Sequence, residues 1–162
     1  MNKSPKVEII QPPNLLRDKV TKLDGGDGVD VDLSAVHAVI DNLSVEFAER
    51  LPGELTRIEL ALADLTEDPG SIDKRKHLFL LVHDLKGQAG TFGYMLITVI
   101  GNDLCRFIER PVALRFRCLK VMSFFVDAMK RVCDEKMTGD DPARGQKIID
   151  ALHAMTQKVL QE

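Results

Sequence analysis

The sequence predicts an all-α protein: an antiparallel four-helix bundle with an additional N-terminal helix and a flexible N-terminal arm. Apolar residues recur at helical spacing through most of the chain, no run alternates convincingly as a strand does, and the connections are short. Hydrophobic residues make up 44% of the 162 residues, enough for one core. Helices are expected at 33–50, 53–66, 72–92, 94–109, 111–136 and 142–160.

Prolines mark most of the expected helix boundaries. The pairs at 52–53 and 69–70 are both Pro-Gly, and Asp141 before Pro142 is typical of an N-cap followed by proline at the first helical position. The apolar, β-branched segment 95–100 could also form a buried strand. A lone strand would leave its backbone groups unpaired, so a central helix is favoured.

Residues 1–30 differ in composition from the rest of the chain. They contain three of the seven prolines and a glycine-rich run at 25–28, and their helical periodicity is poor. This composition predicts a flexible arm at 1–30, dispensable for activity, followed by a helical domain at 31–162.

The charge and the cysteines exclude several classes of protein. The 22 Lys and Arg against 25 Asp and Glu give a net charge of −3, which argues against nucleic-acid binding through a basic face. The longest apolar run is too short to cross a membrane, and the N-terminus lacks a signal-peptide core. Three cysteines without a Cys-x-x-Cys pair form neither a metal motif nor a disulfide framework. A cytoplasmic protein without a metal or cofactor of its own is expected.

The segment 78–94 carries the chemistry. On a helix at about 100° per residue, one face holds the apolar stripe Leu78, Leu81, Leu85, Ala89 and Phe92. His83 lies almost opposite and is expected to face solvent. The outer face also holds Lys76, Phe79, Leu80, Lys86, Gly87 and Gly90. Each of these two glycines lowers the stability of the helix by about 1 kcal/mol relative to alanine. Their place on the outer face argues against a role in helix packing. We therefore expect that the face needs room beside the imidazole.

The run His83-Asp-Leu-Lys86-Gly87-Gln-Ala-Gly-Thr-Phe-Gly93 resembles the signature of histidine-phosphotransfer (HPt) domains, in particular the phosphoacceptor domain of chemotaxis kinases. The resemblance covers 78–94 by motif and about 33–136 by architecture. It implies a phosphorelay protein that accepts and donates a phosphoryl group on His83. The implied partners are response-regulator receiver domains, which hold the Mg²⁺, and a sensor or hybrid histidine kinase. A monomer without nucleic-acid or membrane partners is expected, acting as a phosphocarrier rather than an enzyme.

Elementary chemistry agrees with these roles. A neutral imidazole is a good nucleophile near pH 7, and phosphoryl transfer needs positioning and charge stabilisation. Lys86, one turn after His83, can meet the phosphoryl oxygens, and Gly87 leaves a partner space to approach. Which residue of the following helix supports His83 stays open among Cys105, Arg106 and Glu109.

The remaining outer face predicts a docking patch for the receiver. Phe79 and Leu80 are expected to anchor it, with Gly90 beside them and with Lys76 and Lys86 facing the receiver's acidic pocket. In the alternative interpretation, the first helix folds over Phe79 and Leu80 and buries both.

Two other functions compete with phosphotransfer. An HPt-like module could dock on receivers or kinases without transferring phosphate, although such an adaptor has no need of His83, Lys86 and Gly87 together. An ATP-consuming kinase is disfavoured because the chain is short and has no glycine-rich nucleotide box. The other histidines, His37, His77 and His153, lack the Lys-Gly context, so His83 is predicted to be the sole phosphorylation site.

Overall fold

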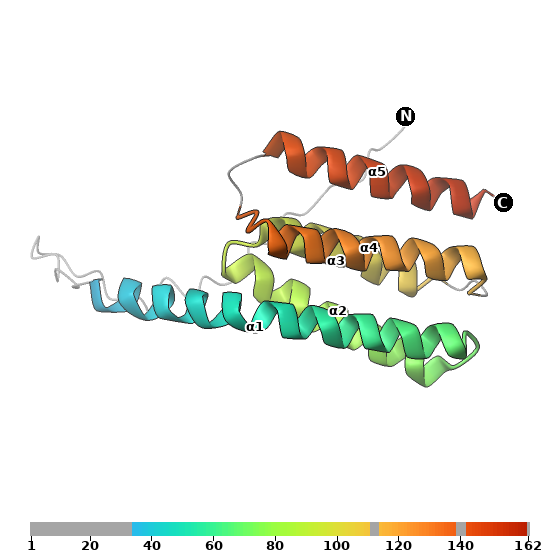
Figure 1. Ribbon diagram of the computed structural model, residues 1–162, viewed down its shortest axis with the longest axis horizontal. Helices are drawn as coiled ribbons and strands as arrows, with labels where there is room; N and C mark the ends of the chain where they lie inside the picture. The colour runs from blue at the N-terminus through green and yellow to red at the C-terminus, as the bar shows by residue number, and fades with distance from the viewer. Residues whose placement is uncertain (1–33, 111–113, 139–141, 162) are drawn as a thin grey trace, which may run out of the picture. The chain divides into compact units, whose positions relative to one another are not determined.

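The computed structural model describes residues 34–110, 114–138 and 142–161. The chain divides into two units, 1–33 and 34–162, and the arm expected at 1–30 lies outside the described residues. The described ranges contain helices and no strand, which confirms the all-α class (Figure 1). The helices of these ranges are α1 (Ser34–Glu67), α2 (Ile72–Thr91), α3 (Met95–Ile108), α4 (Phe116–Asp134) and α5 (Pro142–Leu160).

Four of these helices form a closed ring of neighbours. α1 packs against α2 and α4, and α3 packs against the same two helices. α5 packs on α4, and a hydrogen bond of 2.8 Å between His153 Nε2 and Asp103 Oδ2 joins it to α3. Within the described ranges, α5 is therefore the helix outside this ring, and the segment expected as a first helix at 33–50 is described from Ser34 as the first part of α1.

The expected break at Pro52-Gly53 does not occur, because α1 runs through it as one helix. A buried stripe continues across the proline at steps of three and four residues: Phe47, Leu51, Leu55, Ile58, Leu62 and Leu65. Burial of each such side chain stabilises the fold by about 1.5–3 kcal/mol. Together they outweigh the cost of about 3 kcal/mol for an interior proline and about 1 kcal/mol for glycine.

Local contacts define both ends of α2 and hold it against α3. Ser71 caps the start of α2 by accepting a hydrogen bond of 3.3 Å from the amide of Lys74. Gly93 ends the hairpin turn with a φ of +84°, a conformation that favours glycine. At the other end of α3, Arg75 of α2 donates from Nε to the carbonyl oxygen of Ile108 at 2.7 Å. The two helices are thus fixed to each other at both ends.

The segment 95–100 is helical, as expected, and α3 supplies much of the core with Ile97, Ile100, Leu104, Phe107 and Ile108. α4 begins later than expected, at Phe116, because Leu114 is buried in the core from a non-helical backbone. Residues 111–113 lie outside the described ranges. No helix in the described part of the chain has the combined length and apolarity to cross a membrane.

Replacement of Pro52 with alanine is expected to raise the free energy of unfolding by about 1–3 kcal/mol, because it restores a backbone donor inside a continuous helix. Pro69→Ala, in the turn between α1 and α2, is the matched control and should lower stability by no more than about 1 kcal/mol. Urea unfolding followed by circular dichroism measures both. Equal stability of Pro52→Ala and the native chain would mean that α1 is broken at this position.

Candidate functional site

The buried face of α2 is rotated from the one expected. Leu78, Val82, Leu85 and Ala89 are buried, whereas Leu81 and Phe92 are only partly buried. Val82 replaces Leu81 at the centre of the stripe. The reason lies on α3, where a Cβ on Gly101 would lie 3.7 Å from Val82 Cγ1, so α2 turns toward a glycine. This rotation also brings part of the outer face of α2, including Lys86 and Gly90, toward α3.

His83 points away from the core, as expected, and its side chain is 54% exposed. The Phe79 ring, one turn earlier, stacks on the imidazole with ring centroids 5.7 Å apart and planes 30° apart. His83 Nδ1 lies 3.8 Å from an Asp84 carboxylate oxygen, beyond hydrogen-bond distance. The imidazole is therefore accessible, and its orientation depends on neighbours from its own helix.

Lys86 is half-buried, and its position depends on α3. Its Nζ donates to Asn102 Oδ1 at 3.3 Å, and its backbone carbonyl accepts a hydrogen bond of 2.9 Å from the Thr98 hydroxyl. Its Cβ lies so close to Gly101 that an added methyl group there would meet it at 3.0 Å. The ammonium group is thus held at a defined place one turn after His83.

The two glycines of the motif have different surroundings. A Cβ added to Gly87 would meet nothing within 4 Å, so the space expected beside His83 exists there. A Cβ added to Gly90 would lie 3.0 Å from Thr98 Oγ1. Gly90 thus serves the close packing of α2 on α3, and the expectation that it does not was wrong.

A shallow hollow of about 440 Å³ lies next to this contact. Its lining combines Lys86, Gly87 and Gly90 of α2 with Thr98 and Asn102 of α3. Sequence reasoning missed Thr98 and Asn102. A signal was present, because two polar residues four apart in an apolar helix share one face.

None of the three residues considered as a support for His83 takes that role in the described structure. Cys105 is buried, and this burial raises the pKa of its thiol to about 11, although the Lys86 charge lowers it and Glu109 raises it. Arg106 lies 3.9 Å from Asp103, and Glu109 is exposed. Among the described residues, α3 contacts the site through Lys86 rather than through a hydrogen bond to the imidazole.

The residues of the expected docking patch differ in how far they are exposed. Lys76 is exposed, and Leu80 is 46% exposed on the outer side of α2. Phe79 is partly buried against the core and stacks on His83. It is therefore neither a fully exposed anchor nor a side chain fully buried under the first helix.

The side chains of two of the other three histidines are described. His77 is exposed on α2, His153 bonds Asp103, and the side chain of His37 lies outside the described part. Within the described residues, no three His, Cys, Asp or Glu side chains are grouped as metal ligands.

The two glycines allow a matched test of the packing. Gly87→Ala should raise the free energy of unfolding by about 0.5–1 kcal/mol, because alanine is the better helix former and its methyl group enters open space. Gly90→Ala should not raise the free energy of unfolding, because the added methyl group meets the Thr98 hydroxyl, which donates a hydrogen bond to the backbone carbonyl of Lys86. Urea unfolding of both variants measures the difference. Equal stabilisation by both would show that α2 and α3 are not in close contact at Gly90.

Comparison of the chain with protein-family models, with curated proteins and with solved structures finds no match. A function therefore has to be inferred from the exposed His83, the restrained Lys86 and the open space at Gly87.

Proposed function

We propose that this protein is a histidine-phosphotransfer protein, which accepts a phosphoryl group on His83 and passes it on between receiver-domain aspartates of a phosphorelay. The observation that supports this most directly is an accessible imidazole with a restrained lysine one turn later and open space over Gly87. The resemblance of 83–93 to the HPt signature supports the same function.

The accepting step needs no cofactor held by this chain. The lone pair of one imidazole nitrogen forms a bond to phosphorus while the bond from phosphorus to the aspartyl oxygen breaks. The carboxylate leaves with the bonding electron pair, and the proton on the other ring nitrogen stays in place. Because the Asp84 carboxylate lies on the Nδ1 side, it favours the proton on Nδ1 and leaves the lone pair on Nε2. The donating step is the reverse reaction on a second receiver, and Mg²⁺ is supplied by the receiver in both.

Lys86 is suited to stabilise charge during the transfer. In the structure its ammonium group donates to the neutral amide oxygen of Asn102. An anionic phosphoryl oxygen is a stronger acceptor than an amide oxygen. Lys86 can therefore exchange Asn102 for the phosphoryl group, and Asn102 acts as a positioning residue that holds the lysine ready.

The receiver approaches the outer side of α2. Gly87 gives its acidic pocket room, and Leu80 and Lys76 offer an exposed apolar side chain and a charge within about two turns of His83. Phe79 acts through the imidazole, because a stacked ring restricts the orientations in which the nucleophilic nitrogen faces the receiver.

His83→Gln is expected to abolish acid-labile labelling when the chain is incubated with phosphorylated receiver domains encoded in the same genome. The amide keeps the polarity of the exposed site but has no nucleophilic ring nitrogen. His77→Gln and His153→Gln, both exposed, are the matched controls and should be labelled like the native chain. Labelling retained in His83→Gln would refute the assignment, and receiver binding without labelling of the native chain would favour the docking module instead.

Lys86→Met is expected to slow transfer at least tenfold, because loss of about 1.4 kcal/mol of charge stabilisation is a factor of ten. Methionine keeps the apolar stem over Gly101, so the free energy of unfolding should change by no more than about 0.5 kcal/mol. Asn102→Ala, which removes the acceptor and leaves the charge, should slow transfer less. Quench-flow rates with a phosphorylated receiver measure all three chains, and a native rate in Lys86→Met would rule out a charge role.

A further inference from the structure

Two exposed apolar surfaces lie outside the proposed site, and the first is the start of α1. Phe47 stacks on Phe92 with ring centroids 4.8 Å apart, and it packs on Tyr94 at the α2–α3 turn. Residues before Phe47 therefore pass the end of the bundle, and Figure 1 shows α1 projecting beyond the other helices. We call residues 38–49 the α1 extension, although its last turn already contacts the bundle.

The α1 extension is apolar and acidic. Four of its side chains are 45–59% exposed: Val39, Ile40, Leu43 and Val45. Ile40 and Leu43 continue the stripe that is buried from Phe47 onward. Asp41, Glu46 and Glu49 are exposed, and 38–49 contain no Lys or Arg. An apolar stripe with acidic flanks is thus left without a partner in the described structure.

The second surface is a groove between α4 and α5. α4 contributes Phe116, Lys120 and Phe124 at steps of four residues, and α5 contributes Met155, Lys158 and Val159. Phe116 is 75% exposed and Phe124 is 37% exposed. The groove has a volume of about 180 Å³, and a hollow of about 440 Å³, lined in part by Arg115, adjoins it at Phe116, Arg117 and Val159. We call these residues the α4–α5 groove.

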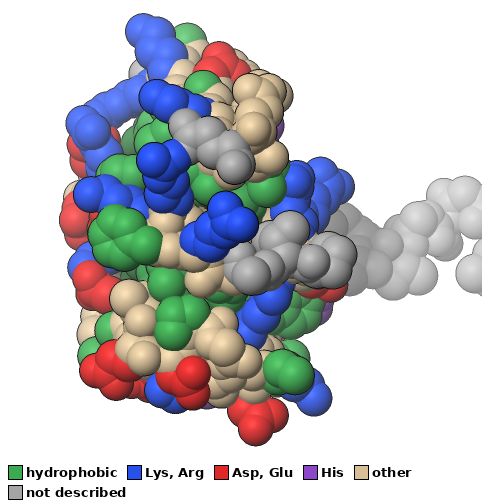
Figure 2. All heavy atoms as spheres, turned by 90° about the vertical axis from the view of Figure 1, so that its right-hand side faces the viewer, with side chains coloured by type: hydrophobic (Ala, Val, Ile, Leu, Met, Phe, Trp, Pro, Cys, Tyr) green, Lys and Arg blue, Asp and Glu red, His purple; other side chains and the backbone are tan. Residues whose placement is uncertain are grey.

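The rim of the α4–α5 groove is basic. Arg115, Arg117, Lys120 and Lys158 lie along it, and its described lining includes no Asp or Glu. Figure 2 shows many of the Lys and Arg side chains gathered over the upper part of this end of the molecule, with Asp and Glu mainly along its left edge and lower part. The protein is acidic overall, so the groove concentrates the opposite charge.

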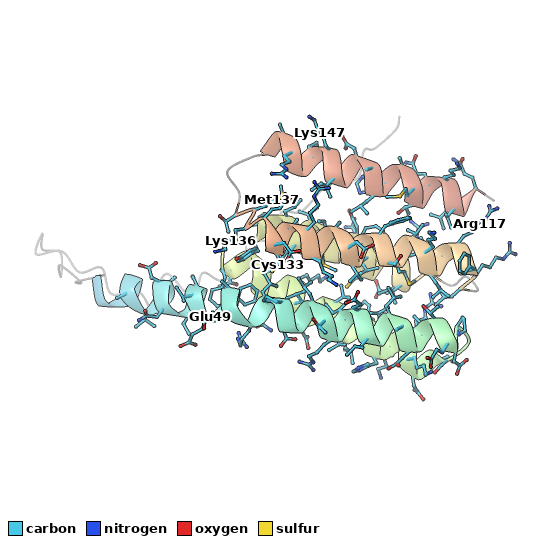
Figure 3. All side chains as sticks on the ribbon, viewed as in Figure 1. Glu49, Arg117, Cys133, Lys136, Met137 and Lys147 are labelled. Atoms are coloured by element: carbon cyan, nitrogen blue, oxygen red, sulfur yellow. The ribbon has the colours of Figure 1, made fainter. Side chains whose placement is uncertain are left out.

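We infer that the α1 extension of one copy of this chain docks in the α4–α5 groove of a second copy. The two surfaces match in both respects, because an apolar helical stripe meets an aromatic groove and acidic flanks meet a basic rim. They cannot meet within one chain. Leu43 lies about 36 Å along α1 from the end where α1 terminates, and Glu49 and Arg117 lie toward opposite ends of the bundle in Figure 3.

An antiparallel pair of copies makes this contact twice, because each extension then reaches the groove at the far end of its partner. Such a pair is closed and buries both exposed surfaces. The monomer expected from the sequence is replaced by a self-associating chain. His83 lies on α2, outside both surfaces, so phosphotransfer on His83 is independent of this association.

Sedimentation of the full chain over roughly 1–300 µM tests the inference. Association should be seen, and it should weaken as salt rises from about 0.1 to about 1 M, where the screening length falls from about 10 to about 3 Å. Leu43→Asp and the double variant Lys120→Glu/Lys158→Glu should each raise the dissociation constant at least about tenfold. Leu60→Asp, at an exposed leucine in the other half of α1, and Lys147→Glu, near the other end of α5, are the matched controls and should associate like the native chain.

A mixture of the two defective variants provides the decisive measurement. Leu43→Asp keeps an intact groove and the double variant keeps an intact extension, so the mixture should form a heterodimer through one contact. Light scattering with one variant carrying a mass tag detects it, and melting curves confirm that both variants are folded. A monomer at every concentration overturns the inference, even if the groove captures an acidic peptide or anionic vesicles. Association that neither variant weakens, or a mixture that stays monomeric, also overturns it.

Discussion

The close approach of α2 and α3 is the constraint on which the site depends. Glycine stands on each helix where they meet, and a Cβ at Gly90 or at Gly101 would come within 3.0 Å of the opposite helix. This proximity allows the Thr98 hydroxyl to reach the carbonyl of Lys86 and the Asn102 amide to reach its ammonium group. The charge that we assign to phosphoryl transfer is therefore positioned by glycine packing, at the cost of helix propensity in both helices.

The same packing explains why the His83 side chain is accessible to solvent. Three residues on a helix turn through about 300°, so His83 and Lys86 lie about 60° apart around the axis of α2. Because Lys86 lies at the edge of the contact with α3, His83, about 60° farther around the helix, faces solvent. Among the described residues, the recorded contacts of the imidazole are with its own helix, with Phe79 one turn earlier and Asp84 next in the chain. Accessibility and orientation thus come from different elements.

Most of the fold could be predicted from the sequence, because helical periodicity is a local signal. The expectations that failed were those in which a local rule competes with burial. Pro52 lies inside α1 because the apolar stripe crosses it, and Gly90 lies at a helix contact because α2 has two neighbours rather than one. The apolar stripe of α2 indicates one buried face, and it does not show that a second face packs against another helix. Asn102 was missed for the same reason, since its role depends on how α2 and α3 are rotated against each other.

α5 and the start of α1 contribute little to the core, which the ring of α1 to α4 already closes. Leu152 is the one side chain of the described part of α5 that is fully buried, and α1 before Phe47 has none among 38–46. Yet α5 supplies one wall of the groove beside Phe116, and the start of α1 carries the apolar and acidic stripe. Exposed apolar side chains in such number weaken solubility unless they have a partner. Because the two elements that the core does not need are the ones with complementary surfaces, contact between copies accounts for both with a single interaction.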